Sequence, residues 1–270
     1  MKIKFLLAAV LLATAFWSCS KSEKSSKILV AYYSQTGATK AVAEELQRQL
    51  GADIVTIEAE EPYDTDYAST VTRWRQERDN GVKVAIRPLE VEIEKYDTIF
   101  LGFPVWGGSY ASPIATFLAD NSLAGKIVVA FATFGSGGIE TATADVVKAQ
   151  PEATVVEGYG VRNARVGKAK EEITRFLVEN GYIDGEVARL PDYGMAEPVT
   201  DDDVTVFETA CGDYQFPLGT PVSVAKRSYG GTTDYKFEVK SETPDGNENR
   251  STIFVLITDG GSPEFTRVVR

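Results

Sequence analysis

The sequence predicts an α/β fold, a doubly wound five-stranded parallel sheet of order 2-1-3-4-5, joined to a small C-terminal α+β unit with one helix on an antiparallel meander. From residue 27 onward, short apolar runs rich in β-branched residues alternate with amphipathic helical stretches, which is typical of a parallel sheet covered on both faces. This alternation stops near residue 184, and strand-like segments separated by turn residues follow. The length of 270 residues also favours two domains over one.

The elements of the parallel sheet follow from these runs. Strands are expected at 28–33, 53–57, 98–102, 126–131 and 154–158. Helices are expected between them, at about 39–50, 113–118, 141–148 and 168–179. In such sheets ligands bind beyond the carboxyl ends of the strands, so the three loops at that edge matter most for function.

The C-terminal unit is expected to span 199–270, after a boundary that follows a first domain of residues 27–184. A helix capped at Thr200 would carry Val204, Phe207 and Cys211 on one face. Strands are expected near 222–226, 235–240, 252–257 and 265–269. About 70 residues make a marginal core, so we expect this unit to dock on the first domain or on a partner. Cys211 is interpreted as a small buried apolar residue.

Composition excludes several classes of chemistry. The chain has no histidine, which excludes serine and cysteine nucleophiles activated by histidine and the usual histidine-ligated metal sites. Its two cysteines are too few for an iron–sulfur cluster that needs four thiolates. No metal site is therefore expected. The formal charge of −11 argues against nucleic acid as a partner.

The first 26 residues have the pattern of an export signal followed by a tether. Lys2 and Lys4 precede an apolar run at 5–17 that is too short to span a membrane, so residues 1–18 are expected to be a cleaved signal peptide. The sequence before Cys19 resembles a bacterial lipoprotein box, with Cys19 as the lipidated residue. The alternative is an ordinary signal with an incidental Cys19. Residues 19–26 are small and polar like a flexible tether.

The lipoprotein reading places the protein outside the cytoplasm, anchored to a membrane on the periplasmic side or at the cell surface. Cleavage after residue 18 would remove two lysines and no acidic residue, which changes the formal charge from −11 to −13.

The first of the three loops follows the first strand and precedes a helix. A phosphate group there would meet free backbone N–H groups, the positive end of the helix dipole and three hydroxyl groups. The alternative is an ordinary strand-to-helix turn with a capping threonine. The residues predicted to bind are Ser34, Gln35, Thr36, Gly37, Ala38 and Thr39.

The second and third loops are suited to a large flat ring. Trp106 could lie against such a ring, and the glycines beside it allow the backbone to approach. The glycine-rich third loop presents several N–H groups in a concave array. The predicted binding residues of the two loops are Pro104, Val105, Trp106, Gly107, Gly108, Thr133, Phe134, Gly135, Ser136, Gly137 and Gly138.

Together these loops and their order resemble the flavodoxin family in its short form, over about residues 27–183. The resemblance implies noncovalent FMN, with its phosphate at the first loop and its ring held by Trp106 and the third loop. Many flavodoxins stack a second aromatic residue on the ring, and here Phe134 and Tyr110 are the residues available. Receiver domains share this architecture but need acidic residues where Ser34-Gln35 and Phe103-Pro104 stand.

One further helical pattern lies between the second and third strands. Tyr67, Val71 and Trp74 share a helical face, and we interpret them as core residues rather than cofactor contacts.

The function expected from these features is that of an exported, membrane-tethered FMN protein that carries electrons to or from a redox partner with a basic surface. No catalytic residue is assigned, and the sequence does not predict an oligomeric state. One alternative is an FMN-dependent NAD(P)H:quinone-type oxidoreductase. The other is a flavin-free binding lipoprotein that keeps the fold.

Overall fold

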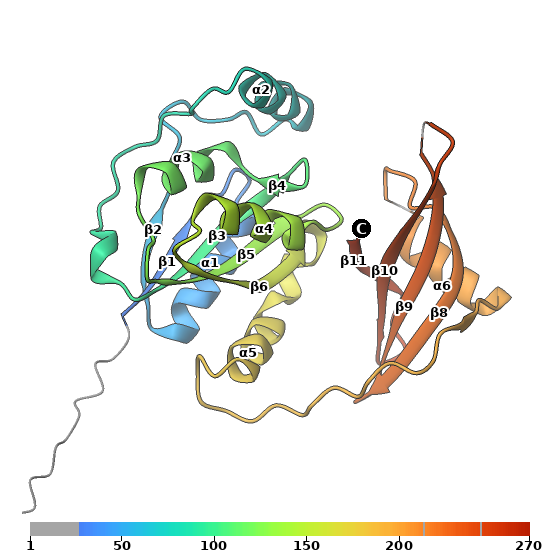
Figure 1. Cartoon of the computed structure of the whole chain (residues 1–270). Helices are drawn as coiled ribbons and strands as arrows, with labels where there is room; N and C mark the ends of the chain where they lie inside the picture. Colours follow the sequence, from blue (N-terminus) through green and yellow to red (C-terminus); the bar gives the residue numbers. More distant parts are fainter. Residues whose placement is uncertain (1–26, 213, 244) are drawn as a thin grey trace, which may run out of the picture.

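The computed structural model describes residues 27–212, 214–243 and 245–270, which form two sheets flanked by helices (Figure 1). The predicted signal peptide, Cys19 and the tether lie outside the described residues. The fold class predicted from the sequence is confirmed for both units.

The first sheet is parallel, with the order β2-β1-β3-β5-β6. Its strands are β1 (Ile28–Tyr32), β2 (Asp53–Thr56), β3 (Thr98–Trp106), β5 (Ile127–Phe134) and β6 (Thr154–Arg162). A short strand, β4 (Ser109–Tyr110), folds back on β3 in antiparallel orientation. Counted along the main sheet, this is the predicted order 2-1-3-4-5.

Two strands, β3 and β6, extend further than the sequence predicts, because glycines that resemble strand ends lie inside them. Gly102 lies in β3, where a Cβ atom would be 2.1 Å from the ring of Phe131. Gly158 lies in β6, where a Cβ would be 2.3 Å from the carbonyl oxygen of Ala130. These glycines allow close packing inside the sheet instead of ending it.

Helices cover both faces of this sheet (Figure 1). The α-helices are α1 (Ala38–Leu50), α2 (Tyr67–Asp79), α3 (Ser112–Asp120), α4 (Ile139–Ala149) and α5 (Ala169–Glu179), with 3-10 turns η1 (Ile93–Lys95) and η2 (Asn163–Lys168). In β1, Leu29 and Ala31 join the core shared with α3 and α4. Val30 and Tyr32, which point the other way, join the core shared with α1 and α5.

The second sheet is an antiparallel meander of order β11-β10-β9-β8-β7. Its elements are β7 (Glu197–Pro198), α6 (Asp201–Cys211), β8 (Thr220–Tyr229), β9 (Thr232–Glu242), β10 (Glu248–Thr258) and β11 (Glu264–Val269). Phe207 and Cys211 of α6 pack on Phe237, Ile253 and Phe265 in a separate core. Cys211 is 9% exposed, which confirms its interpretation as a small buried residue.

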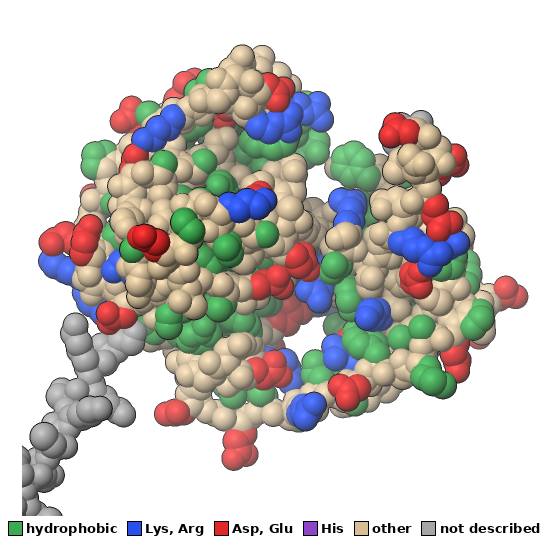
Figure 2. Space-filling model, in the orientation of Figure 1, with side chains coloured by type: hydrophobic (Ala, Val, Ile, Leu, Met, Phe, Trp, Pro, Cys, Tyr) green, Lys and Arg blue, Asp and Glu red, His purple; other side chains and the backbone are tan. Residues whose placement is uncertain are grey.

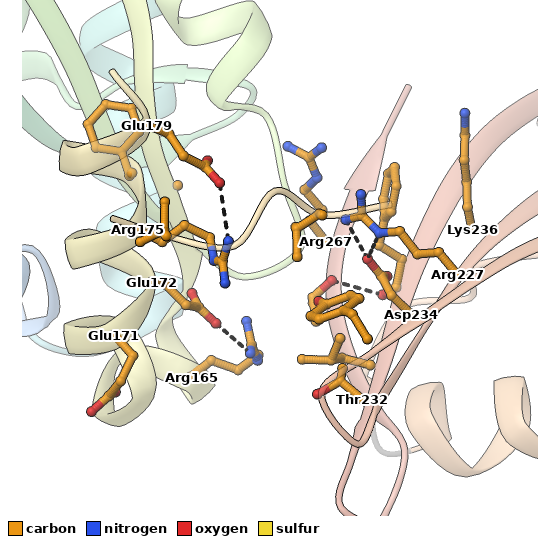
Figure 3. A pocket seen from close by; sticks show the side chains of 18 of the residues that line it. Arg165, Glu171, Glu172, Arg175, Glu179, Arg227, Thr232, Asp234, Lys236 and Arg267 are labelled. Carbon is orange, nitrogen blue, oxygen red and sulfur yellow. Dashed lines mark hydrogen bonds and ion pairs between the residues drawn. The ribbon is translucent and has the colours of Figure 1, made fainter. Parts of the chain in front are cut away.

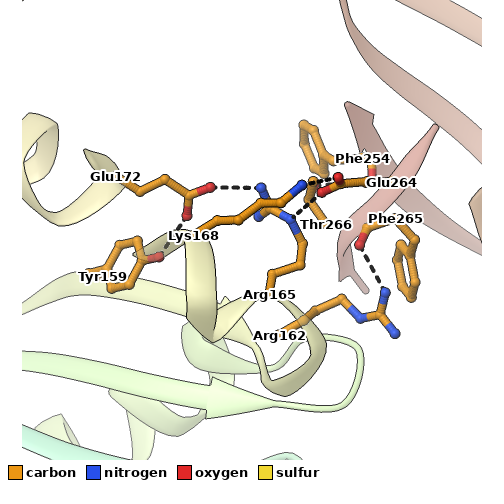
Figure 4. A network of polar contacts seen from close by, with 9 residues as sticks. All are labelled: Tyr159, Arg162, Arg165, Lys168, Glu172, Phe254, Glu264, Phe265 and Thr266. Atoms are coloured by element: carbon orange, nitrogen blue, oxygen red, sulfur yellow. Dashed lines mark hydrogen bonds and ion pairs between the residues drawn. The ribbon is translucent and has the colours of Figure 1, made fainter. Parts of the chain in front are cut away.

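The two units contact each other through β11 and the segment that follows β6 (Figure 4). Arg165 donates to Glu172 at 2.7 Å and to Glu264 of β11 at 3.3 Å, and Lys168 also pairs with Glu264. Burial opposes ionisation of Glu264, but the ion pairs with Lys168 and Arg165 outweigh it and lower the pKa of this carboxyl group. The expected docking of the C-terminal unit on the first domain is therefore present.

Within the ranges that the structure describes, no helix combines the length and apolar character needed to cross a membrane.

Candidate functional site

A cavity of about 420 Å³ lies at the carboxyl ends of β1, β3 and β5, where the three predicted loops meet. This volume falls within the range of roughly 300–1,000 Å³ that is typical of small-molecule sites. The predicted residues that line it are Gln35, Thr36, Thr39, Pro104, Val105, Trp106, Gly107, Thr133, Phe134 and Gly135.

A cavity of about 490 Å³ adjoins the first and shares Val105, Gly107 and Gly135 with it. It is lined by the remaining predicted residues of the second and third loops, which are Gly108, Ser136, Gly137 and Gly138. Ser34, Gly37 and Ala38 line neither of the two cavities. Most of the residues predicted from three separate loops thus meet in one depression of the surface.

The first loop turns at Gly37, which has a φ of 93° and precedes α1. The Ser34 hydroxyl accepts a hydrogen bond from the Gly37 N–H at 3.2 Å and so fixes the turn. The Gln35 amide donates to the Thr70 hydroxyl at 2.5 Å, which connects the loop to α2. Thr36 remains exposed at the start of the helix, where the dipole favours an anion.

Thr39 connects the first loop to the third. Its hydroxyl oxygen lies 2.9 Å from that of Thr133, and both side chains are almost fully buried. In such a pair one hydroxyl donates, and the other keeps its own proton for a further acceptor. The pair therefore leaves one O–H donor for a ligand at the floor of the cavity.

The second loop is a tight hairpin between β3 and β4. Val105 pairs with Tyr110 and Trp106 with Ser109, so that Gly107 and Gly108 form a two-residue turn. Their φ angles of 56° and 88° are both positive, as a type I′ turn requires, and glycine adopts such angles without steric cost.

Trp106 is partly buried and is supported by two tyrosines. Its ring contacts Tyr63 edge-on at 4.8 Å and Tyr33 at 5.8 Å between centroids. Burial raises the pKa of Tyr63, and the hydrogen bond that its hydroxyl donates to Glu77 at 2.6 Å raises it further. Tyr63 thus stays protonated, and Trp106 has a rigid aromatic support behind the cavity.

The third loop is held open by its glycines and anchored by its neighbours. Gly138 has a φ of 105° and precedes α4. The Phe134 side chain is only 2% exposed and packs in the core, and Tyr110 packs edge-on against Phe103 at 6.1 Å. The two aromatic residues considered as a second stacking partner are therefore committed to packing inside the first domain.

Sequence reasoning missed α2 as a wall of the cavity. Tyr67, Val71 and Trp74 line it, although we interpreted this helical face as core. Tyr67 is 65% exposed, which contradicts that interpretation. The Trp74 ring lies so close to Gly107 that a Cβ there would be 1.9 Å from it. The helical spacing of these residues was the available signal, but periodicity alone does not distinguish a core from a ligand cavity.

The remaining lining residues carried no signal in the sequence. Thr65, Thr70 and Arg75 come from the segment around α2, whereas Asn163 follows β6 and Gln215 belongs to the C-terminal unit.

A larger cavity, of about 930 Å³, lies between the two units, away from the three loops (Figure 3). It contains several arginines, but these face acidic partners: Arg165 pairs with Glu172, Arg175 with Glu179 and Arg227 with Asp234. Its charges are thus largely neutralised within the protein, as expected of an interface between domains. The smaller cavity, with its hydroxyl and aromatic groups, is the better candidate for a ligand site.

The sequence profile of the flavodoxin family matches residues 27–180, more than half of the chain. The chain belongs to the flavodoxin family. This confirms the family predicted from the loops, and it confirms FMN as the predicted cofactor. No curated protein matches this flavodoxin.

Similar solved structures include flavoproteins from three bacteria. A protein from Bacteroides eggerthii described as a flavoprotein is 31% identical, with 55% of this chain and 98% of that chain covered and a TM-score of 0.44. One from Bacteroides uniformis is 26% identical, covering 56% and 99% with a TM-score of 0.47. A flavoprotein from Lactobacillus acidophilus, solved in complex with FMN, is 24% identical, covering 53% and 98% with a TM-score of 0.44.

The residues around the cavity fit FMN. The positive end of α1 and the Thr36 hydroxyl suit a phosphate, and Trp106 offers an aromatic face to a flat ring. The glycines at 107, 108, 135, 137 and 138 leave their own backbone groups without side chains to obstruct them. The donor set is made of hydroxyl, backbone and aromatic groups, which agrees with the exclusions drawn from composition.

Proposed function

We propose that this flavodoxin binds FMN in the 420 Å³ cavity and carries electrons between protein partners outside the cytoplasm. The observation that supports this most directly is the meeting of the three loops around one cavity with a supported Trp106. Bound FMN would supply the redox chemistry, since it accepts and releases electrons one or two at a time. The residues of the chain bind it, orient it and limit its contact with water.

The surface charge favours a basic partner. Acidic side chains lie on both units in the view of Figure 2, and the whole chain carries a formal charge of −11. A negative surface speeds the encounter with a positively charged protein and is screened by salt. The same charge opposes the addition of electrons to the cofactor, which lowers the redox potential expected for bound FMN.

The carrier role is tested against the reductase alternative by two assays on the FMN-loaded protein. A carrier reduced with dithionite passes electrons to a basic haem protein such as cytochrome c, and the rate falls as ionic strength rises. A carrier also consumes no NADH or NADPH at a steady rate in the presence of a quinone. Steady consumption of either nucleotide, together with a salt-independent reaction with cytochrome c, would contradict the carrier role and favour an NAD(P)H-dependent reductase.

We also propose that Cys19 carries the lipid that tethers the protein to a membrane. Radiolabelled palmitate supplied to cells that express the full chain should label the protein, and Cys19→Ser should abolish both the label and recovery in the membrane fraction. An unchanged membrane fraction for Cys19→Ser would contradict the tether.

A further inference from the structure

The segment that follows α6 in the C-terminal unit lies at the predicted cofactor site. Gln215 lines the 420 Å³ cavity together with Trp106 and Gly135. Tyr214, Gln215 and Phe216 all line the adjoining cavity, together with the glycines of the second and third loops. The family match ends at residue 180, so this wall is an addition of this chain to the family's domain.

Contacts from the C-terminal unit hold the third loop in place. Arg162 of β6 donates to the Gly135 carbonyl at 2.7 Å. It also donates to the Phe265 carbonyl at 2.9 Å (Figure 4). The Val268 N–H of β11 donates to the Ser136 carbonyl at 2.7 Å. A Cβ on Gly137 would be 2.0 Å from the Val268 carbonyl oxygen, so only glycine allows this strand to approach.

The same contacts position Tyr214. Its ring packs edge-on against Phe265 at 5.4 Å, and the Arg162 guanidinium lies 4.0 Å from the Phe265 ring centre and 5.4 Å from that of Tyr214. The Phe216 ring packs against Tyr214 at 5.8 Å. The third loop is thus connected to Phe216 through successive contacts of Arg162, Phe265 and Tyr214.

The exposure of Phe216 itself indicates a role at this place. Among the described residues, the exposed large aromatic side chains are Tyr67, at 65%, and Phe216, at 47%, and both line the adjoining cavity. Exposed aromatic surface is costly to leave in water, and these two side chains meet in one cavity and are not scattered over the surface. Within the first domain, Phe134 lines the 420 Å³ cavity but is only 2% exposed and packs in the core, and Tyr110 packs against Phe103.

We propose that the C-terminal unit completes the flavin site, with Tyr214, Gln215 and Phe216 as its outer wall and Phe216 as an aromatic contact for the bound cofactor. This inference rests on the proposed binding of FMN. It gives the C-terminal unit a function, which is to hold the third loop and to limit access of water and small acceptors to the ring.

The test compares FMN binding by the full chain and by Phe216→Ala, with flavin fluorescence as the readout. Loss of one aromatic contact should raise the dissociation constant roughly three- to tenfold and should increase quenching of the bound flavin by iodide. Met195→Ala is the matched control, because Met195 is 88% exposed and lines neither part of the site. Phe216→Trp should restore tight binding and protection from iodide.

Two outcomes separate this inference from the proposed function. If the wild-type chain binds FMN and Phe216→Ala matches it in both affinity and iodide quenching, Phe216 does not contact the cofactor. The inference about the outer wall is then wrong, whereas the proposed binding of FMN is retained. If the wild-type chain fails to bind FMN, both the proposed function and the inference about the outer wall are wrong.

Discussion

Two adjacent glycines in the β3–β4 hairpin have similar backbone angles but different surroundings. A side chain at Gly107 would meet the Trp74 ring, whereas a Cβ at Gly108 has no atom within 4 Å. Each substitution by alanine should cost about 1–2 kcal/mol, because both residues have a positive φ. Only Gly107→Ala should also displace Trp74, shift the tryptophan emission and weaken FMN binding. Urea unfolding measures the loss of stability, and fluorescence spectra measure the displacement of Trp74, with Gly108→Ala as the matched control. Equal emission spectra for the two variants would contradict the contact between Gly107 and Trp74.

Cys211 is predicted to be chemically inert. Burial raises the pKa of its thiol to about 12, an effect that the nearby Arg162 only partly offsets. The thiolate fraction at pH 8 is then on the order of 10³ times smaller than for an ordinary thiol, so labelling should slow by a similar factor. The reaction of a Cys19→Ser protein with Ellman's reagent measures this, with the unfolded protein as the control. A native rate equal to the unfolded rate would contradict the burial.

At the scale of elements, α6 depends on its N-terminal cap. The Thr200 hydroxyl accepts from the Asp203 N–H at 3.3 Å, and the Asp203 carboxylate accepts from the Thr200 N–H at 3.1 Å. Thr200→Ala should therefore destabilise the protein by about 1 kcal/mol in urea unfolding. Thr205→Ala, on the exposed side of the same helix, should be neutral or slightly stabilising. Equal effects for the two variants would show that the cap contributes nothing.

Some of the helices and strands could be predicted from the sequence, and others could not. The capping Thr200, the spacing of α1 and the apolar run of β1 follow from local physical rules, and the structure confirms these elements. The ends of β3 and β6 could not be predicted in this way, because glycine normally weakens a strand. Gly102 lies inside β3 because it packs closely against the ring of Phe131, a contact that no local pattern predicts. The face of α2 was misinterpreted because a buried face and a cavity wall have the same helical period.

At the scale of the whole molecule, the contact between the units should depend on pH. Burial favours the neutral form of Glu264, but its pairs with Lys168 and Arg165 lower its pKa below the usual value for a glutamate. A carboxylate with a lowered pKa stabilises the folded state above its unfolded pKa, and this contribution is lost as pH falls through the folded pKa.

Glu264→Gln should therefore lower the stability of the protein at pH 6 by about 1 kcal/mol or less, since Glu264 is partly exposed, and the difference should vanish near pH 3. Urea midpoints across this pH range measure it, with Glu242→Gln, an exposed carboxylate of β9, as the control. A difference between wild type and Glu264→Gln that persists unchanged at low pH would contradict the ion-pair account.

The contribution of the C-terminal unit lay beyond sequence reasoning. The three loops could be predicted because each follows a strand of one parallel sheet, and the topology brings such loops together. Gln215 and Phe216 reach the same place only through tertiary contacts of β11 with the third loop, which no local pattern encodes.

We expect this flavodoxin to hold FMN at the meeting point of the three loops. The most direct measurement is the visible spectrum of the purified protein after incubation with FMN and removal of free cofactor by desalting. We expect flavin absorbance to elute with the protein at a ratio near one FMN per chain. A protein fraction without flavin absorbance, with all FMN in the small-molecule fraction, would contradict FMN binding.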